Sequence, residues 1–163
     1  MKKRTLGTNH MLNKMTFEFQ ARSINQSFAR SVVALFASQL DPTVEEIDDL
    51  KTAVSEAVTN CIVHAYQDKG GMVSIECELY PTSVRVTVVD KGVGIDNVSQ
   101  AIEPFFTTRP TDEDRSGMGF TVMQSFMDTL DVSSKTGEGT VVIMQKFFSQ
   151  LAKAKEKQVA GGV

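Results

Sequence analysis

The chain has 163 residues, of which 41% are hydrophobic and 23% are charged, a composition typical of one globular domain with one core. Its net charge of -3 argues against direct nucleic-acid binding, which normally requires a basic excess. No apolar run reaches the length of a membrane span, and the basic N-terminus lacks the apolar segment of a secretory signal, so we expect a soluble, cytoplasmic protein.

The first predicted elements are a tail, a strand and a helix. Residues 1–14 are polar and aperiodic, which predicts a flexible tail. Strict alternation over residues 15–21 predicts a half-buried strand. Helical periodicity over residues 24–39 predicts a helix whose apolar stripe consists of Ile24, Phe28, Val32, Leu35 and Phe36.

A second helix is predicted from a capping box, with Thr43 as the N-cap and Glu46 three residues later. It runs to about Tyr66, and the glycines of residues 68–71 end it. Its predicted apolar stripe consists of Ile47, Leu50, Val54, Val58, Cys61, Ile62 and Ala65.

Two alternating stretches, 72–80 and 83–90, predict an antiparallel pair of strands with one buried face. Residues 96–116 lack clean periodicity, and so long an irregular stretch in a small domain indicates a functional loop, often a lid.

The last third of the chain predicts a helix that begins near Gly117 or Gly119 and runs to Leu130. A strand, a glycine turn and a strand follow over residues 131–147, and a short charged helix with a tail over residues 149–163. This order predicts an α/β two-layer sandwich, with helices on one face of a mostly antiparallel sheet.

Two cysteines and two histidines give no familiar zinc spacing. Cys61 falls in a helical pattern and Cys77 in a strand pattern, so we expect both to be buried free thiols in a reducing compartment.

Glu56 and Asn60 form the first of three polar motifs, since side chains at positions i and i+4 share one helix face. A solvated polar face would explain the pair without any function. Alternatively, Asn60 supplies its amide oxygen to Mg²⁺, which takes hard oxygen ligands, and Glu56 acts as a general base.

The second motif is "DKGVGI", in which Asp90 ends a strand and is followed by two glycines, Gly92 and Gly94. The glycines allow the backbone to turn sharply and to approach a ligand. The Asp90 carboxylate accepts hydrogen bonds and would suit the exocyclic amine of adenine. A plain turn at the end of a strand is an equally good interpretation.

The third motif is "DRSGMGF", in which Gly117 and Gly119 stand where a helix begins. Helix N-termini bind phosphate through unpaired N–H groups, and Arg115 could reach a terminal phosphate. Without such a ligand, Ser116 would merely cap the helix. The sequence has no Walker P-loop, no Rossmann fingerprint and no H-R-D or D-F-G kinase motif.

Taken in this order, the three motifs resemble the nucleotide site shared by the gyrase, heat-shock chaperone, histidine-kinase and mismatch-repair ATPases, whose histidine-kinase-like (Bergerat) fold is the implied fold. Within that superfamily the chain resembles the anti-sigma-F factors, small serine protein kinases of spore-forming bacteria. This resemblance covers residues 15–148 and rests on "NQSFAR", "LDPT", "VSEAVTN", "DKGVGI", "PFFTTRP" and "RSGMGFTVMQSFMD". Ala65 departs from it, because glycine is expected there.

The resemblance implies a role for each residue of the first two motifs. Asn60 would hold Mg²⁺ between the phosphates of ATP, and Glu56 would take the proton from a substrate serine. Asp90 would bind adenine, with Gly92 and Gly94 shaping that wall of the site.

The resemblance also implies that Gly117 and Gly119 open the phosphate end of the site and that Arg115 contacts the terminal phosphate. Arg30 matches an arginine that contacts protein partners. The remaining nucleotide-binding positions that it implies are Thr107, Thr108, Ser116, Met118 and Thr140.

The implied activity is twofold. As an ATP- and Mg²⁺-dependent serine/threonine kinase, the protein would phosphorylate an anti-anti-sigma protein. As a homodimer, it would bind a sigma-F-type sigma factor and keep it from RNA polymerase core, which regulates sporulation. The unphosphorylated anti-anti-sigma protein would displace the sigma factor, and phosphorylation would cancel that displacement.

Three alternatives stay open. A histidine-kinase catalytic module would need a phospho-accepting histidine on a dimerisation helix, and His64 is poorly placed for that role. A non-catalytic protein that binds a sigma factor under ATP control would not need Glu56. A stress-response anti-sigma kinase would share the nucleotide motifs, but we would not expect it to contain "PFFTTRP".

Overall fold

Five antiparallel strands form one sheet in the order β1-β2-β3-β5-β4, in a computed structural model that describes residues 10–104 and 118–161. The strands are β1 (Asn13–Gln20), β2 (Met72–Tyr80), β3 (Ser83–Asp90), β4 (Thr129–Lys135) and β5 (Gly139–Phe147). The helices are α1 (Ile24–Ala37), α2 (Val44–Asn60), α3 (Val98–Ile102), α4 (Gly119–Phe126) and α5 (Ser149–Ala160). A 3-10 turn (Ser38–Leu40) follows α1, and a π-helical turn (Cys61–Ala65) continues α2.

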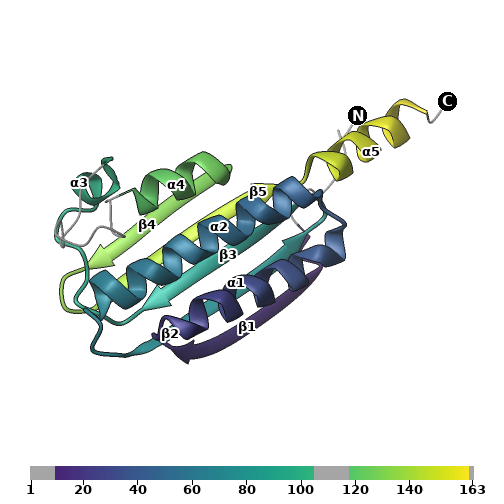
Figure 1. The fold of residues 1–163 in the computed structure, drawn as a ribbon. Helices are drawn as coiled ribbons and strands as arrows, with labels where there is room; N and C mark the ends of the chain where they lie inside the picture. The colour runs from purple at the N-terminus through teal and green to yellow at the C-terminus, as the bar shows by residue number, and fades with distance from the viewer. Residues whose placement is uncertain (1–9, 105–117, 162–163) are drawn as a thin grey trace.

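Helices α1, α2 and α4 lie on one face of the sheet, while α5 extends away from its end (Figure 1). The predicted two-layer α/β sandwich is therefore confirmed. The predicted strands 72–80 and 83–90 have the observed bounds of β2 and β3, since strict alternation fixed both their ends and their buried face. The first strand begins at Asn13, two residues earlier than predicted.

The core lies between the sheet and α2. From α2, Leu50, Val54 and Val58 are completely buried, as the predicted stripe requires. The three central strands of the sheet, β2, β3 and β5, contribute a matching set of buried side chains. These are Val73, Ile75, Cys77, Leu79, Val84, Val86, Val88 and Met144. Each such large side chain contributes about 1.5–3 kcal/mol by leaving water, so α2 is held against the sheet along its length. Cys61 and Cys77 are both buried and free, as predicted.

The predicted apolar stripe of α1 was wrong at three of its five positions, since Val32 and Phe36 are partly buried and Phe36 packs against the core. Ile24, Phe28 and Leu35 are exposed, whereas the buried face consists of Ala29, Val33, Ala34 and Ala37. The small side chains of the buried face allow α1 to pack closely. Ile24, Phe28 and Leu35 also recur at helical spacing, but they lie on the exposed face. Phe28 makes edge-on contacts with Phe17 and Phe19 of β1.

Two further predictions differ from the structure. The helix expected to reach Leu130 ends at Phe126, because Thr129 and Leu130 already pair with β5. The irregular stretch predicted over residues 96–116 contains the short helix α3, whose N-cap Asn97 accepts a hydrogen bond from the Gln100 backbone at 3.0 Å. Among the helices of the described residues, none combines the length and the apolar character needed to cross a bilayer.

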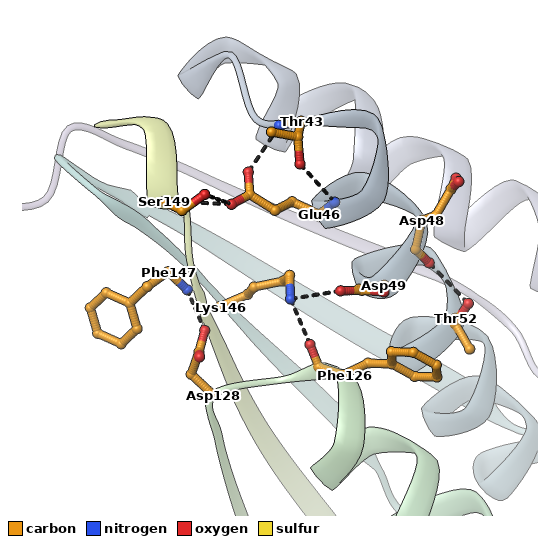
Figure 2. A network of polar contacts seen from close by, with 10 residues as sticks. All are labelled: Thr43, Glu46, Asp48, Asp49, Thr52, Phe126, Asp128, Lys146, Phe147 and Ser149. Carbon is orange, nitrogen blue, oxygen red and sulfur yellow. Dashed lines mark hydrogen bonds and ion pairs between the residues drawn. The ribbon is translucent and has the colours of Figure 1, made fainter. Parts of the chain in front are cut away.

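A polar network fastens the N-terminal end of α2 to its neighbours (Figure 2). The predicted capping box is present: the Thr43 hydroxyl accepts from the Glu46 backbone at 3.1 Å, and the Glu46 carboxylate accepts from the Thr43 backbone at 2.9 Å. The other carboxylate oxygen of Glu46 accepts from the backbone and the hydroxyl of Ser149, at 2.7 and 2.8 Å. One glutamate thus joins the start of α2 to the start of α5.

Lys146 of β5 forms the second part of this network. Its ammonium group lies 3.0 Å from the carboxylate of Asp49 on α2 and donates to the carbonyl of Phe126, at the C-terminus of α4, at 2.8 Å. A cation at that position is favoured by the helix dipole. The buried lysine therefore connects the sheet with both helices that carry the polar motifs.

Substitution of Glu46 by glutamine should destabilise the protein by about 1–3 kcal/mol at neutral pH, because a charged acceptor of several hydrogen bonds is lost. Burial alone would raise the pKa of Glu46, but its hydrogen bonds with Ser149 and Thr43 outweigh burial and lower the pKa below 4.5. A lowered folded-state pKa stabilises the fold above the unfolded value, so the deficit should shrink as the pH falls through the folded-state pKa. Urea denaturation at a series of pH values measures this.

The matched control is Glu45→Gln, which changes an exposed glutamate in the same helical turn and should shift stability by less than about 0.5 kcal/mol. Equal effects of the two substitutions would contradict the structural role of Glu46.

Candidate functional site

A cavity of about 540 Å³ lies between the C-terminal half of α2, the loop after β3, α3 and the start of α4. Its volume is within the range of small-molecule sites. The polar motifs of α2, β3 and α4, which are far apart in the sequence, all contribute to its wall.

Glu56 and Asn60 line this cavity, which argues against a purely solvated polar face for the pair. Both side chains lie next to the first residue of α4. A Cβ atom built on Gly119 would stand 3.1 Å from Asn60 Oδ1 and 3.3 Å from Glu56 Oε2. Glycine at this position therefore leaves open the space between the helix N-terminus, the carboxylate and the amide.

The N-terminus of α4 lies at this space, since Met118, Gly119 and Phe120 line the cavity. Its N-cap, Met118, makes no side-chain capping hydrogen bond. The N–H groups of a first helical turn have no partner within their own helix, and together with the helix dipole they favour an anion. An anionic group bound here would lie beside Asn60 and Glu56.

Glu56 is half-buried, and burial raises its pKa above 4.5. Such a carboxylate is less well solvated than a surface one and is correspondingly more basic. A carboxylate of this kind, beside an anion-binding helix N-terminus, is suited to accept a proton from a reacting group.

Asp90 also lines the cavity and is only 6% exposed. Its Oδ1 accepts from the Gly92 backbone at 3.0 Å, and its Oδ2 accepts from the Cys61 thiol at 3.6 Å. Burial raises the pKa of Asp90, although these hydrogen bonds and one from the Thr140 backbone oppose that rise. A buried carboxylate in the wall of a cavity is a specific acceptor for a ligand N–H group.

The glycines after Asp90 fit the loop closely against its neighbours. A Cβ on Gly92 would come within 2.3 Å of the Ala65 carbonyl oxygen, which accepts a hydrogen bond from the Val93 backbone at 2.9 Å. Gly94 has a φ of +76° and lines the cavity, and a Cβ there would stand 2.2 Å from the carbonyl of Lys135. Gly92 therefore allows the loop to pack against Ala65 without lining the cavity, while Gly94 is part of the cavity lining.

The π-helical turn Cys61–Ala65 connects α2 with the loop after Asp90, and sequence patterns gave no signal for it. Tyr66 follows this turn, and its phenol accepts from the Lys91 backbone at 2.8 Å and donates to the Met72 carbonyl at 2.6 Å. The loop that follows Asp90 is thus fixed to the end of the helix that carries Glu56 and Asn60. Short π-helical turns are frequent at functional sites.

Most of the described candidate residues meet in this one cavity. Its lining includes Glu56, Asn60, Asp90, Gly94, Met118, Gly119 and Thr140. Arg30 is exposed on α1 and does not line it. Five candidates lie outside the described residues: Thr107, Thr108, Arg115, Ser116 and Gly117.

The cavity also contains residues that the motifs did not identify. His64 lines it one helical turn beyond Asn60, and continuing the spacing of Glu56 and Asn60 would have found it. Asp96 and Asn97 line it from the start of α3, and Asp96 accepts a hydrogen bond from Thr136. No spacing pattern in the sequence points to these two. Within the described ranges no three histidine, cysteine or acidic side chains are grouped as a metal site.

Comparisons with known proteins agree with this geometry. A family model described as the histidine kinase-like ATPase domain matches residues 18–146. The chain is 55% identical to an anti-sigma F factor of Clostridium beijerinckii over 138 residues, which make up 84% of this chain and 96% of that protein. It is 56% identical to an anti-sigma F factor of Clostridium acetobutylicum over 137 residues, covering 84% and 95% of the two chains.

Solved structures show the same fold. The catalytic domain of histidine kinase ThkA aligns with a TM-score of 0.50 and 19% identity, over 82% of this chain and 97% of that one. The blue-light activated histidine kinase of Erythrobacter litoralis EL346 aligns with a TM-score of 0.53 and 23% identity, over 76% of this chain and 42% of that one. At such identities the likeness concerns the fold alone, and it confirms the predicted histidine-kinase-like architecture.

Substitution of Glu56 by glutamine should stabilise the protein at neutral pH. A carboxyl group whose folded-state pKa lies above its unfolded value favours the fold below the unfolded value, and this contribution is lost as the pH rises through the folded-state pKa. Because the Glu56 pKa is raised from 4.5, Glu56→Gln should have the higher melting temperature at pH 7, and the difference should vanish near pH 4.

The control for this substitution is Glu18→Gln, on the exposed face of β1, which should change the melting temperature at pH 7 little, as most surface substitutions do. A lower melting temperature of Glu56→Gln at pH 7 would mean that the Glu56 carboxylate has a stabilising partner.

Proposed function

The chain belongs to the histidine kinase-like ATPase family and, within it, to the anti-sigma F factors, and on this premise we propose that it is a serine/threonine protein kinase that also sequesters a sigma factor. ATP with Mg²⁺ is its phosphoryl donor, and its substrate is a serine on a small anti-anti-sigma protein. The observation that carries the proposal is the meeting of Glu56, Asn60, the start of α4 and the buried Asp90 in the lining of one cavity.

The residues present fit Mg²⁺-ATP. Asp90 accepts the exocyclic amine of adenine, with Gly94 and Thr140 in the same part of the wall. The phosphates lie at the N–H groups of α4, where Gly119 leaves room for them. Asn60 would hold Mg²⁺ through its amide oxygen, since this metal takes hard oxygen ligands and few of them from protein. When bound, Mg²⁺ neutralises charge that develops on the phosphates.

Glu56 acts as the general base. The serine oxygen of the substrate attacks the terminal phosphorus of ATP, the serine proton passes to the Glu56 carboxylate, and ADP leaves. The raised pKa of Glu56, caused by burial, brings its basicity closer to neutral pH, where a general base is most effective. Positioning and electrostatic stabilisation account for most of the acceleration in such transfers, and from outside the described residues Arg115 would contribute to both.

The binding activity uses a different surface. We infer that a homodimer holds a sigma-F-type sigma factor away from RNA polymerase core in the cytoplasm, and that the unphosphorylated anti-anti-sigma protein displaces it during sporulation. Arg30 is exposed on α1 and available to both partners. The exposed apolar stripe of Ile24, Phe28 and Leu35 on the same helix supplies apolar area for a protein interface.

Kinase activity is tested by incubating the protein with Mg²⁺-ATP and a candidate anti-anti-sigma protein, followed by mass spectrometry for phosphoserine. The wild type should phosphorylate the partner. Glu56→Gln should bind ATP normally but lose at least about 100-fold in rate, because general-base catalysis contributes about 10²–10⁴-fold. Asn60→Ala should lose Mg²⁺-dependent ATP binding as well.

Each alternative has its own outcome in this experiment. If the protein binds ATP and a sigma factor but produces no phosphoserine, it is a non-catalytic sigma-binding protein. Phosphohistidine on the chain itself would indicate a histidine-kinase module.

Arg30→Ala should weaken sigma-factor binding by about tenfold or more, as loss of an interface arginine commonly does, and should leave the dissociation constant for ATP unchanged. Titration against several purified sigma factors measures this and also separates the sporulation branch from the stress-response branch. Arg22→Ala is the matched control, because Arg22 is also exposed and lies just before α1. Equal losses in both variants would indicate non-specific charge attraction.

A further inference from the structure

The Asp90 carboxylate lines the cavity and accepts hydrogen bonds from the Cys61 thiol and from the backbones of Gly92 and Thr140. We propose that Cys61 is a positioning residue for the nucleotide base, because its thiol holds the Asp90 carboxylate in the orientation that receives the exocyclic amine of adenine. This inference rests on the proposed ATP site and adds a residue that determines its base selectivity.

The geometry supports this role. Cys61 is the first residue of the π-helical turn, is 4% exposed and lines the cavity. Its sulfur lies 3.6 Å from Oδ2 of Asp90, while the Gly92 backbone donates to Oδ1 at 3.0 Å. A donor on each oxygen, in addition to the Thr140 backbone, restricts the rotation of the carboxylate plane more than the backbone donors alone would. A carboxylate has about four acceptor directions, so three donors leave one for a ligand.

The thiol acts as a donor in this pair. A carboxylate offers only acceptors, so the hydrogen bond between the two side chains runs from the Cys61 thiol to Oδ2 of Asp90. A thiol is a weak donor, but loss of a donor to a buried carboxylate is costly. A side chain at this position orients Asp90 only if it carries a donor.

Cys77 provides the comparison that separates orientation from packing. It is 0% exposed in the core on β2 and does not line the cavity. Burial raises its pKa to about 12, so it too remains a protonated thiol. Cys61→Ala and Cys77→Ala therefore each remove one buried sulfur, but only the first removes a donor from Asp90.

The experiment measures the dissociation constants of Mg²⁺-ATP and of purine riboside triphosphate, which lacks the 6-amino group, by calorimetry. Wild type, Cys61→Ala, Cys61→Ser and Cys77→Ala are compared, with melting temperatures to establish that each is folded. In Cys61→Ala the preference for ATP over the purine analogue should fall by about threefold or more, the effect of losing one hydrogen bond. Cys61→Ser and Cys77→Ala should keep the wild-type preference.

The outcomes separate the two proposals. If the wild type binds neither nucleotide, the proposed ATP site fails. If it prefers ATP and Cys61→Ala keeps the same preference, the role of Cys61 is wrong while the ATP site stands. An equal loss of preference in Cys61→Ala and Cys77→Ala would also overturn the inference, because packing would then explain both.

Discussion

The packing of α2 against the sheet is the constraint on which the rest of the structure depends. Leu50, Val54 and Val58 bury one face of this helix completely, and the same rotation of the helix turns Glu56 and Asn60 toward α4. The core thus determines where the polar face points, because neither face can move without the other. Fixing reactive groups on a rigid, well-packed element is what catalysis by positioning requires.

The two ends of α2 are fixed by different contacts, and both sets of contacts involve elements next to the cavity. At the N-terminal end, Glu46 binds the start of α5, and Lys146 of the sheet binds the C-terminus of α4 (Figure 2). At the C-terminal end, the π-helical turn receives the loop after Asp90, with Tyr66 and the Ala65 carbonyl as its attachment points. The end of one helix therefore lies against both α4 and the loop after Asp90.

Much of this could be predicted from the sequence, and the exceptions have physical reasons. Alternation gave β2 and β3 their bounds, and the capping box at Thr43 marked the start of α2. The face of α1 was misassigned because periodicity does not distinguish a buried stripe from an exposed one, and Phe28 lies on an outward-facing surface. In the site, spacing and glycines identified Glu56 and Asp90, but the link from Cys61 to Asp90 depends on a local π-helical turn that no pattern encodes.

The most direct test of the account is a crystal structure of the protein with Mg²⁺ and a non-hydrolysable ATP analogue. The adenine amine should lie within hydrogen-bond distance of Asp90, and the phosphates should lie against the first N–H groups of α4, with the metal beside Asn60. A nucleotide bound outside this cavity, or one with its base at the α4 end, would contradict the central claim that these motifs form a single ATP site.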